Sequence, residues 1–196
     1  WLRGTGSPAF AASAVISPAG GTPGKAVMAL GDLNGDGQRD IVTDYSGGTR
    51  PLAAFVNNKV PGRSLAFEAP GAIVGSATDQ VSFVGLTDLN GDGKPDAVLS
   101  ESGRIVLKIA AGDGTFAAPL VVAGTAGVIY QRSVSVDLDL DGRRDISSIC
   151  NAAGVLVRRN TGATLMVESS FGTFSPGTGD LAAGDLDGDG KLDLVN

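Results

Sequence analysis

Aspartate side chains recur in four nine-residue segments that align without gaps. The segments are D-L-N-G-D-G-Q-R-D (32–40), D-L-N-G-D-G-K-P-D (88–96), D-L-D-L-D-G-R-R-D (137–145) and D-L-D-G-D-G-K-L-D (185–193). We call them loops 1 to 4. Each places oxygen-bearing side chains at positions 1, 3, 5 and 9 and a glycine at position 6, as the first nine positions of an EF-hand calcium loop do. Hard oxygen donors in this number favour calcium.

The spacing predicts one calcium site in each loop, and hence up to four ions. Alternate residues of a tightly curled backbone point toward one centre, and the glycine permits the sharp turn. The main-chain carbonyl of position 7 supplies a further ligand. The predicted metal ligands are Asp32, Asn34, Asp36, Gln38 and Asp40; Asp88, Asn90, Asp92, Lys94 and Asp96; Asp137, Asp139, Asp141, Arg143 and Asp145; and Asp185, Asp187, Asp189, Lys191 and Asp193.

The charge of the loops supports bound cations. Of the 21 acidic residues, 14 lie in the loops, and like charges a few ångströms apart repel by about 1 kcal/mol per pair even in water. The alternative is that the segments are ordinary turns, which favour the same Asp, Asn and Gly residues. Four such segments in register favour calcium. Loops 1 and 2 carry Asn34 and Asn90 at position 3, one charge fewer, so we predict weaker calcium binding there.

The surroundings of the loops differ from those of an EF-hand. Position 12, where an EF-hand has a bidentate Glu, holds Thr43, Leu99, Ser148 or Asn196. The flanking segments, such as A-V-M-A-L and D-I-V-T around loop 1, are typical of short strands. We therefore expect strand–loop–strand sites that the aspartate at position 9 closes.

The loops mark a longer repeat. Their first residues are 56, 49 and 48 apart, and a period near 50 is that of a β-propeller blade. Apolar segments at 51–56, 104–109 and 154–158 predict a third strand, and a phenylalanine after a Gly-rich turn predicts a fourth. These phenylalanines, whose rings we expect between neighbouring sheets, are Phe10, Phe67, Phe116 and Phe174. The predicted fold is all-β, with four antiparallel strands in each blade.

The repeat predicts a single propeller domain, or a fragment of one, over residues 1–196. We expect a half blade at 1–25, blades at about 26–76, 77–126 and 127–179, and a half blade at 180–196. This is about four blades' worth of chain. Either the two halves meet and close a four-bladed ring, or further blades or self-association complete a larger ring.

The chain resembles the FG-GAP and VCBS repeat family of integrin-alpha-like propellers. The resemblance rests on A-L-G-D-L-N-G-D-G-Q-R-D-I-V, V-G-L-T-D-L-N-G-D-G-K-P-D-A-V, A-G-D-L-D-G-D-G-K-L-D-L-V and the turn G-D-G-T-F-A-A-P. It implies a propeller of about seven blades whose calcium loops join the first two strands of each blade, with partners or sugars held by other loops or by clefts between blades. Two features depart from the family pattern: Leu140 stands where glycine is usual, and Phe174 is only 11 residues from Asp185.

Composition excludes several function classes. The chain has no histidine, which excludes imidazole as a base or ligand, and its lone Cys150 lies in an apolar run where we expect a buried thiol. The formal charge of -6 argues against a nucleic-acid or anionic-membrane partner. No stretch approaches the roughly 18 apolar residues of a membrane span, so none is expected.

We expect an extracellular, non-catalytic recognition module, such as a lectin or adhesion protein, that binds a glycan or a protein. Calcium loops of about 10⁻⁴ to 10⁻³ M affinity need a calcium-rich compartment. Trp1, Tyr45 and Tyr130 are the candidate sugar-stacking aromatics if they face solvent. Two alternatives stay open, a domain of a secreted polysaccharide lyase or hydrolase and a structural spacer. No catalytic motif contains the acids outside the loops, which are Asp44, Glu68, Asp79, Glu101, Asp113, Glu168 and Asp180.

Overall fold

The computed structural model describes residues 27–44, 52–57, 81–101, 103–124, 130–151, 154–162, 165–171 and 180–195. All the regular structure in these ranges is β-strand. The strands are β1 (Met28–Gly31), β2 (Asp40–Asp44), β3 (Leu52–Phe55), β4 (Val81–Thr87), β5 (Asp96–Glu101), β6 (Arg104–Lys108), β7 (Leu120–Gly124), β8 (Tyr130–Val136), β9 (Asp145–Cys150), β10 (Gly154–Asn160), β11 (Leu165–Phe171), β12 (Ala182–Gly184) and β13 (Asp193–Val195). Among the described residues there is no helix with the length and apolar character that crossing a membrane requires.

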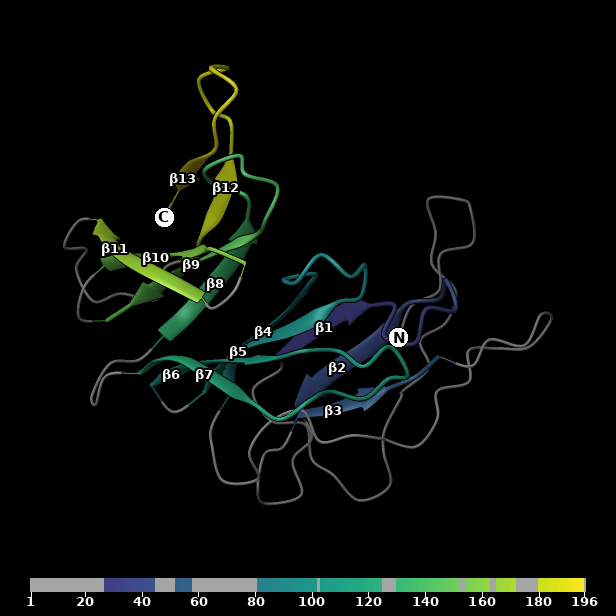
Figure 1. Cartoon of the computed structure of the whole chain (residues 1–196). Helices are drawn as coiled ribbons and strands as arrows, with labels where there is room; N and C mark the ends of the chain where they lie inside the picture. The colour runs from purple at the N-terminus through teal and green to yellow at the C-terminus, as the bar shows by residue number, and fades with distance from the viewer. Residues whose placement is uncertain are drawn as a thin grey trace, which may run out of the picture.

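The strands form four antiparallel sheets, each built from neighbours in sequence (Figure 1). Their strand orders are β1-β2-β3, β4-β5-β6-β7, β8-β9-β10-β11 and β12-β13. The predicted all-β class with antiparallel pairing is therefore confirmed. The segments predicted as third strands are β3, β6 and β10, which confirms those predictions as well.

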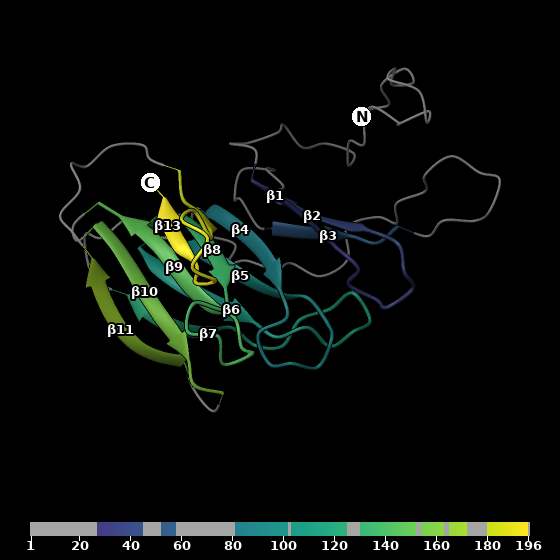
Figure 2. The ribbon, with the colours of Figure 1, turned by 90° about the horizontal axis from the view of Figure 1, so that it is seen from above.

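The sheets follow one another in chain order and pack face to face. Their first strands lie side by side, because β1 contacts β4, β4 contacts β8, and β8 contacts β12. The β8–β11 sheet thus lies between the β4–β7 sheet and the β12–β13 pair (Figure 2). The result is a β-propeller-like series of sheets, with the first and last sheets at its two ends (Figure 1).

The apolar core lies between the sheets, and alternation along each strand builds it. On β5, Ala97 and Leu99 pack toward the preceding sheet, and Val98 between them packs toward the following one. Both faces of β5 are covered, and all six of its residues are buried. A strand buried on both faces needs no polar face, which explains why β5 and β9, both buried along their whole length, show no regular polar alternation in sequence.

Each of the two end sheets has a face that no other described sheet covers. Met28 and Leu30 occupy the same positions on β1, in register with β2, that Val84 and Leu86 occupy on β4, in register with β5. Val84 and Leu86 pack against the preceding sheet, whereas Met28 and Leu30 are 61% and 49% exposed. At the other end of the series, Val195 on β13 is also exposed.

Two further predictions are confirmed. Cys150 is a free and buried thiol, and Phe116 packs against the cluster between the first two sheets. The predicted positions of Phe10, Phe67 and Phe174 lie outside the described residues.

Candidate metal-binding loops

Each acidic loop connects the first two strands of a sheet. Loop 1 runs from β1 to β2, loop 2 from β4 to β5, loop 3 from β8 to β9 and loop 4 from β12 to β13. Loop 4 is the yellow hairpin end that projects at the top of Figure 1. The predicted strand–loop–strand arrangement is therefore present four times.

The aspartate at position 1 folds each loop. In loop 2, Asp88 accepts the main-chain N–H of Gly91 at 2.7 Å and that of Gly93 at 2.8 Å. Loops 1 and 4 repeat both bonds, and loop 3 repeats the second one. The glycine at position 6 donates that second bond from a left-handed conformation. These glycines, with φ between +78° and +88°, are Gly37, Gly93, Gly142 and Gly190.

The aspartate at position 9 ties the loop to the third strand of its sheet. Asp96 accepts the N–H of Leu89, on its own loop, at 2.9 Å and the N–H of Ala110, after β6, at 2.8 Å. Asp40 and Asp145 make the same two kinds of bond, and all three aspartates are buried. Burial raises the pKa of the Asp96 carboxyl, which the two N–H donors oppose. The sequence predicted a ligand here and missed this structural role.

The leucine at position 2 joins loops 1, 2 and 3 to the next sheet. Leu33 and Leu89 are buried between sheets, and Leu138 packs into the third such cluster. The Leu33 carbonyl accepts the N–H of Gly114 at 3.2 Å, and the Leu89 carbonyl accepts from the Asn160 side chain at 2.8 Å. Both donors belong to the following sheet. The loops therefore help to hold successive sheets together.

Side chains at positions 3 and 5 also bond within the loop. In loop 2, Asn90 accepts the N–H of Asp92 at 3.0 Å, and Asp92 accepts the N–H of Lys94 at 2.9 Å. Loops 1 and 4 contain both bonds. In loop 3 only the second is repeated, because the N–H of Asp141 goes to Asp137 at 3.0 Å.

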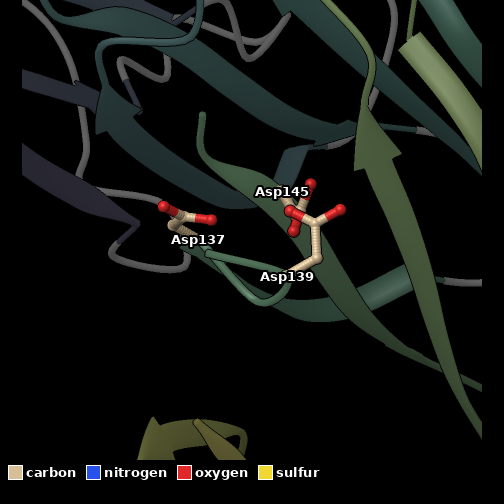
Figure 3. A group of neighbouring side chains, drawn as sticks. All are labelled: Asp137, Asp139 and Asp145. Atoms are coloured by element: carbon tan, nitrogen blue, oxygen red, sulfur yellow. The ribbon is translucent and has the colours of Figure 1, made fainter. Parts of the chain in front are cut away.

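Three carboxylates come together in loop 3 and in loop 4. Oxygens of Asp137, Asp139 and Asp145 lie within 4.8 Å of one another, as do those of Asp185, Asp187 and Asp193. Figure 3 shows the first group, where loop 3 leaves the sheet and returns to it. Either group could hold a metal ion. Loops 1 and 2 have an amide at position 3, so an equivalent cluster there contains two carboxylates and one amide oxygen.

Basic side chains from position 7 lie against the aspartate at position 5. The Lys94 ammonium is 3.6 Å from Asp92, and the Lys191 ammonium is 2.9 Å from Asp189. The main-chain N–H of Lys94 is the main cause of a lowered pKa at Asp92, and the Lys191 side chain is the main cause at Asp189. In loop 3, Arg143 pairs with Asp141.

Loop 3 has a second ion pair that the sequence analysis missed. Arg159, on β10, pairs with Asp139 at position 3. The hydrogen bond that Arg159 donates to Asp139 is the main cause of a raised pKa at Arg159. An alignment of the third strands contains the signal, because Val56 and Ile109 occupy the place of Arg159 in the two preceding sheets.

A cleft opens beside the loops, between the first strands of the two central sheets. Its volume is about 290 Å³, and Gly85, Leu86 and Thr87 on β4 line one wall. Ser133 and Ser135 on β8 line the other, with Val98, Val134 and Arg144 completing the lining. Hydroxyl groups and one guanidinium group are thus available to a polar ligand.

One candidate sugar-stacking residue is corrected. Tyr130 is only 3% exposed, and it packs in the cluster between the two central sheets, beneath the guanidinium of Arg158. Its ring therefore cannot stack on a sugar. Trp1 and Tyr45 lie outside the described residues.

Comparison with known proteins gives one family and one fold. The model of the FG-GAP-like repeat matches residues 88–148 and 137–195, which together exceed half of the chain. No curated protein matches significantly. A solved structure, whose title describes specific recognition of non-reducing terminal N-acetylglucosamine by an Agrocybe aegerita lectin, is similar with a TM-score of 0.62 and 21% identity. The match covers 87% of this chain and 46% of that one, so the chain spans about half the length of this neighbour.

Proposed function

This chain belongs to the FG-GAP-like repeat family, and from that premise we propose that it is an extracellular, calcium-stabilised β-propeller module that recognises a glycan or protein ligand without catalysing a reaction. In this proposal its blades span about residues 26–76, 77–126 and 127–179, with half blades at 1–25 and 180–196. The observation that carries the proposal is the fourfold acidic loop, held by the same hydrogen bonds at the same place in each sheet.

The donor atoms of the loops fit calcium. Positions 1, 3, 5 and 9 offer only oxygen, and in loop 4 the three carboxylates of Asp185, Asp187 and Asp193 lie within 4.8 Å of one another. The bonds that these groups accept from main-chain N–H leave lone pairs free, since each carboxylate has about four. Such oxygen sets select hard cations, and their number suits calcium over magnesium. A bound ion would neutralise carboxylates that otherwise repel one another.

Calcium has a stabilising role in this proposal, because the loops connect strands and adjacent sheets. An ion that binds only the folded state raises its stability by mass action, by about 2.7 kcal/mol at one hundred times the dissociation constant. The low affinity of extracellular calcium modules places the protein where calcium is abundant. We therefore expect the melting temperature to fall by several degrees in EDTA and to recover with added calcium.

Circular dichroism melts in calcium, in EDTA and in magnesium test this role. Magnesium is the control, because it demands near-ideal octahedral geometry and dehydrates reluctantly. An unchanged melt in EDTA contradicts the stabilising role.

The cleft between β4 and β8 supports ligand recognition. Its serine and threonine hydroxyls and the Arg144 guanidinium can bond to sugar hydroxyls or to a peptide backbone. The neighbouring lectin recognises N-acetylglucosamine, which supports sugars as the first class to test. The walls of this cleft are β4, which loop 2 follows, and β8, which loop 3 follows. We therefore expect calcium removal to loosen the cleft.

A glycan array probed with the wild-type chain and with Arg144→Ala tests recognition. We expect signal on defined sugars, weakened by the substitution and by chelator. Arg132→Ala is the matched control, since Arg132 is an exposed arginine on β8 that does not line this cleft. Cleavage of a polysaccharide would favour the enzyme alternative, and no signal on sugars or proteins would favour a spacer.

A further inference from the structure

Loop 3 differs from the other three loops in how its charge is balanced. Arg143 pairs with Asp141 at position 5, and Arg159 pairs with Asp139 at position 3. Loops 2 and 4 have one such pair each, a lysine at position 5. In loop 1, position 7 is the neutral Gln38. Among the pairs that the described residues form, loop 3 alone has a cation on both of the aspartates at positions 3 and 5.

The two arginines are held in place by the fold. The Nε of Arg143 donates to the Asn160 carbonyl at 2.7 Å, at the end of β10. Arg159 is the residue before Asn160, and the N–H of Asn160 donates to the buried Asp145 at 2.7 Å. Both guanidinium groups are therefore anchored to the same end of the same strand. A planar guanidinium grips a carboxylate in a fixed geometry, which a flexible lysine does not.

The backbone of loop 3 differs at the same place. Position 4 is Leu140 with φ +60°, where the other loops have glycine. The N–H of position 5 donates to the side chain of position 3 in the other loops, and in loop 1 it also donates to position 1; in loop 3 the N–H of Asp141 donates to Asp137, at position 1. Asp139 is bonded to Arg159 instead of folding over the loop.

From these contacts we propose that arginines take the place of calcium in loop 3, so that this loop is the last of the four to bind an ion. The proposal rests on the proposed calcium function of the other loops. It also reverses the ranking by carboxylate number, which places loop 3 beside loop 4 as the tightest. Oxygens of Asp139, Asp137 and Asp145 already lie within 4.8 Å of one another, but Arg159 is bonded to the Asp139 carboxylate. Calcium must displace this guanidinium before it can share that carboxylate with Asp137 and Asp145.

The chain itself supplies the substitutions that test this proposal. Arg159→Val introduces the residue found at the equivalent position of the first sheet, Val56. Arg143→Gln introduces the residue at position 7 of loop 1, Gln38. Both arginine side chains are about half exposed, so the double variant keeps its core. Arg132→Val removes one positive charge from the exposed face of β8, as each single substitution in loop 3 does, and is the matched control for Arg159→Val.

Equilibrium dialysis with bound calcium counted by atomic emission is the measurement. We expect three ions on the wild-type chain before a fourth, weaker one, and about tenfold tighter binding of the fourth ion in the double variant, because the loop loses positive charges a few ångströms from the ion. Arg132→Val should bind as the wild type does, whereas Arg159→Lys, which keeps the charge but loses the fixed geometry, should bind the fourth ion more tightly than the wild type and less tightly than Arg159→Val. Four equivalent ions on the wild type, or no change in the double variant, overturn the proposal.

A second pair of variants assigns the ions to loops. Asp187→Asn should weaken one of the first three ions of the wild type, whereas the same change at Asp139 should leave them unaltered and remove the gain of the double variant. Loss of one of the first three ions in Asp139→Asn contradicts the proposal. A wild type that binds no ion overturns the calcium function itself. In that case, melts in EDTA still test whether the arginines stabilise loop 3. Arg159→Val should lower the melting temperature, and an unchanged melting temperature contradicts this role.

Discussion

Backbone conformation, more than contact, limits substitution in the loops. Gly37 lies at φ +78°, with open space where a Cβ would be. Gly184 also has open space there, but an ordinary strand conformation. A left-handed residue with a Cβ costs about 1–2 kcal/mol. The loss in such a variant is therefore a direct measure of backbone strain.

We expect Gly37→Ala to lower the free energy of unfolding by about 1 kcal/mol and Gly184→Ala to leave it nearly unchanged. Leu140→Gly is the reverse change, since it gives loop 3 the glycine of the other loops at a left-handed position, and it should stabilise the chain slightly. Leu140 is exposed, so no core packing is lost. Urea denaturation in EDTA measures all three effects without metal, and equal losses at Gly37 and Gly184 would contradict the explanation.

Local spacing was enough to predict which residues gather in each loop. The bonds of Asp88 to Gly91 and Gly93 span three and five residues, so the sequence alone brings them together. The contact of Arg159 with Asp139 spans 20 residues and depends on where β10 ends against β9. Similarly, the second bond of Asp96, to Ala110, requires the third strand to be in register. Such contacts follow from strand pairing, which no motif contains.

At the scale of elements, each loop leucine measures the interface between two sheets. Leu33 is 1% exposed between the first and second sheets, whereas Leu186, at the same position of loop 4, is 68% exposed. The two residues have the same loop context and differ in what covers them. Leu33→Ala should cost about 3 kcal/mol, and Leu186→Ala close to nothing, in denaturant titrations of the purified chain. Similar losses for both would show that the leucine acts within its loop.

The strands themselves were predictable because burial on both faces leaves a plain apolar run. Val98 and Leu99 are adjacent and face opposite sheets, so the sequence identifies a strand there but not which side meets which neighbour. Tyr130 illustrates the consequence. Its ring points into the core between the central sheets, and no pattern along β8 distinguishes this from an exposed aromatic.

The whole series of sheets ends in two complementary open faces. Met28 and Leu30 are exposed at the positions where Val84 and Leu86 pack against a preceding sheet. Leu186 is exposed at the position where Leu33 packs against a following sheet. Exposed apolar faces of this kind favour association. We expect light scattering to give a mass above the 19.6 kDa of one chain, rising with concentration, and Leu30→Glu or Leu186→Glu to reduce it. A stable single-chain mass in the wild type would favour a closed four-bladed ring instead.

Each central sheet packs one face against the preceding sheet and the other against the following one, so the series of sheets has a direction. In the second and third repeats, the residue after the position-9 aspartate, Ala97 or Ile146, packs against the preceding sheet. The number of repeats can therefore change by whole periods: excising 88–136 would join β4 directly to loop 3, so that β4 would take the place of β8 beside β9. Whole repeats could therefore be inserted or deleted by design, and we expect the sheets at the new junction to pack as the existing neighbours do.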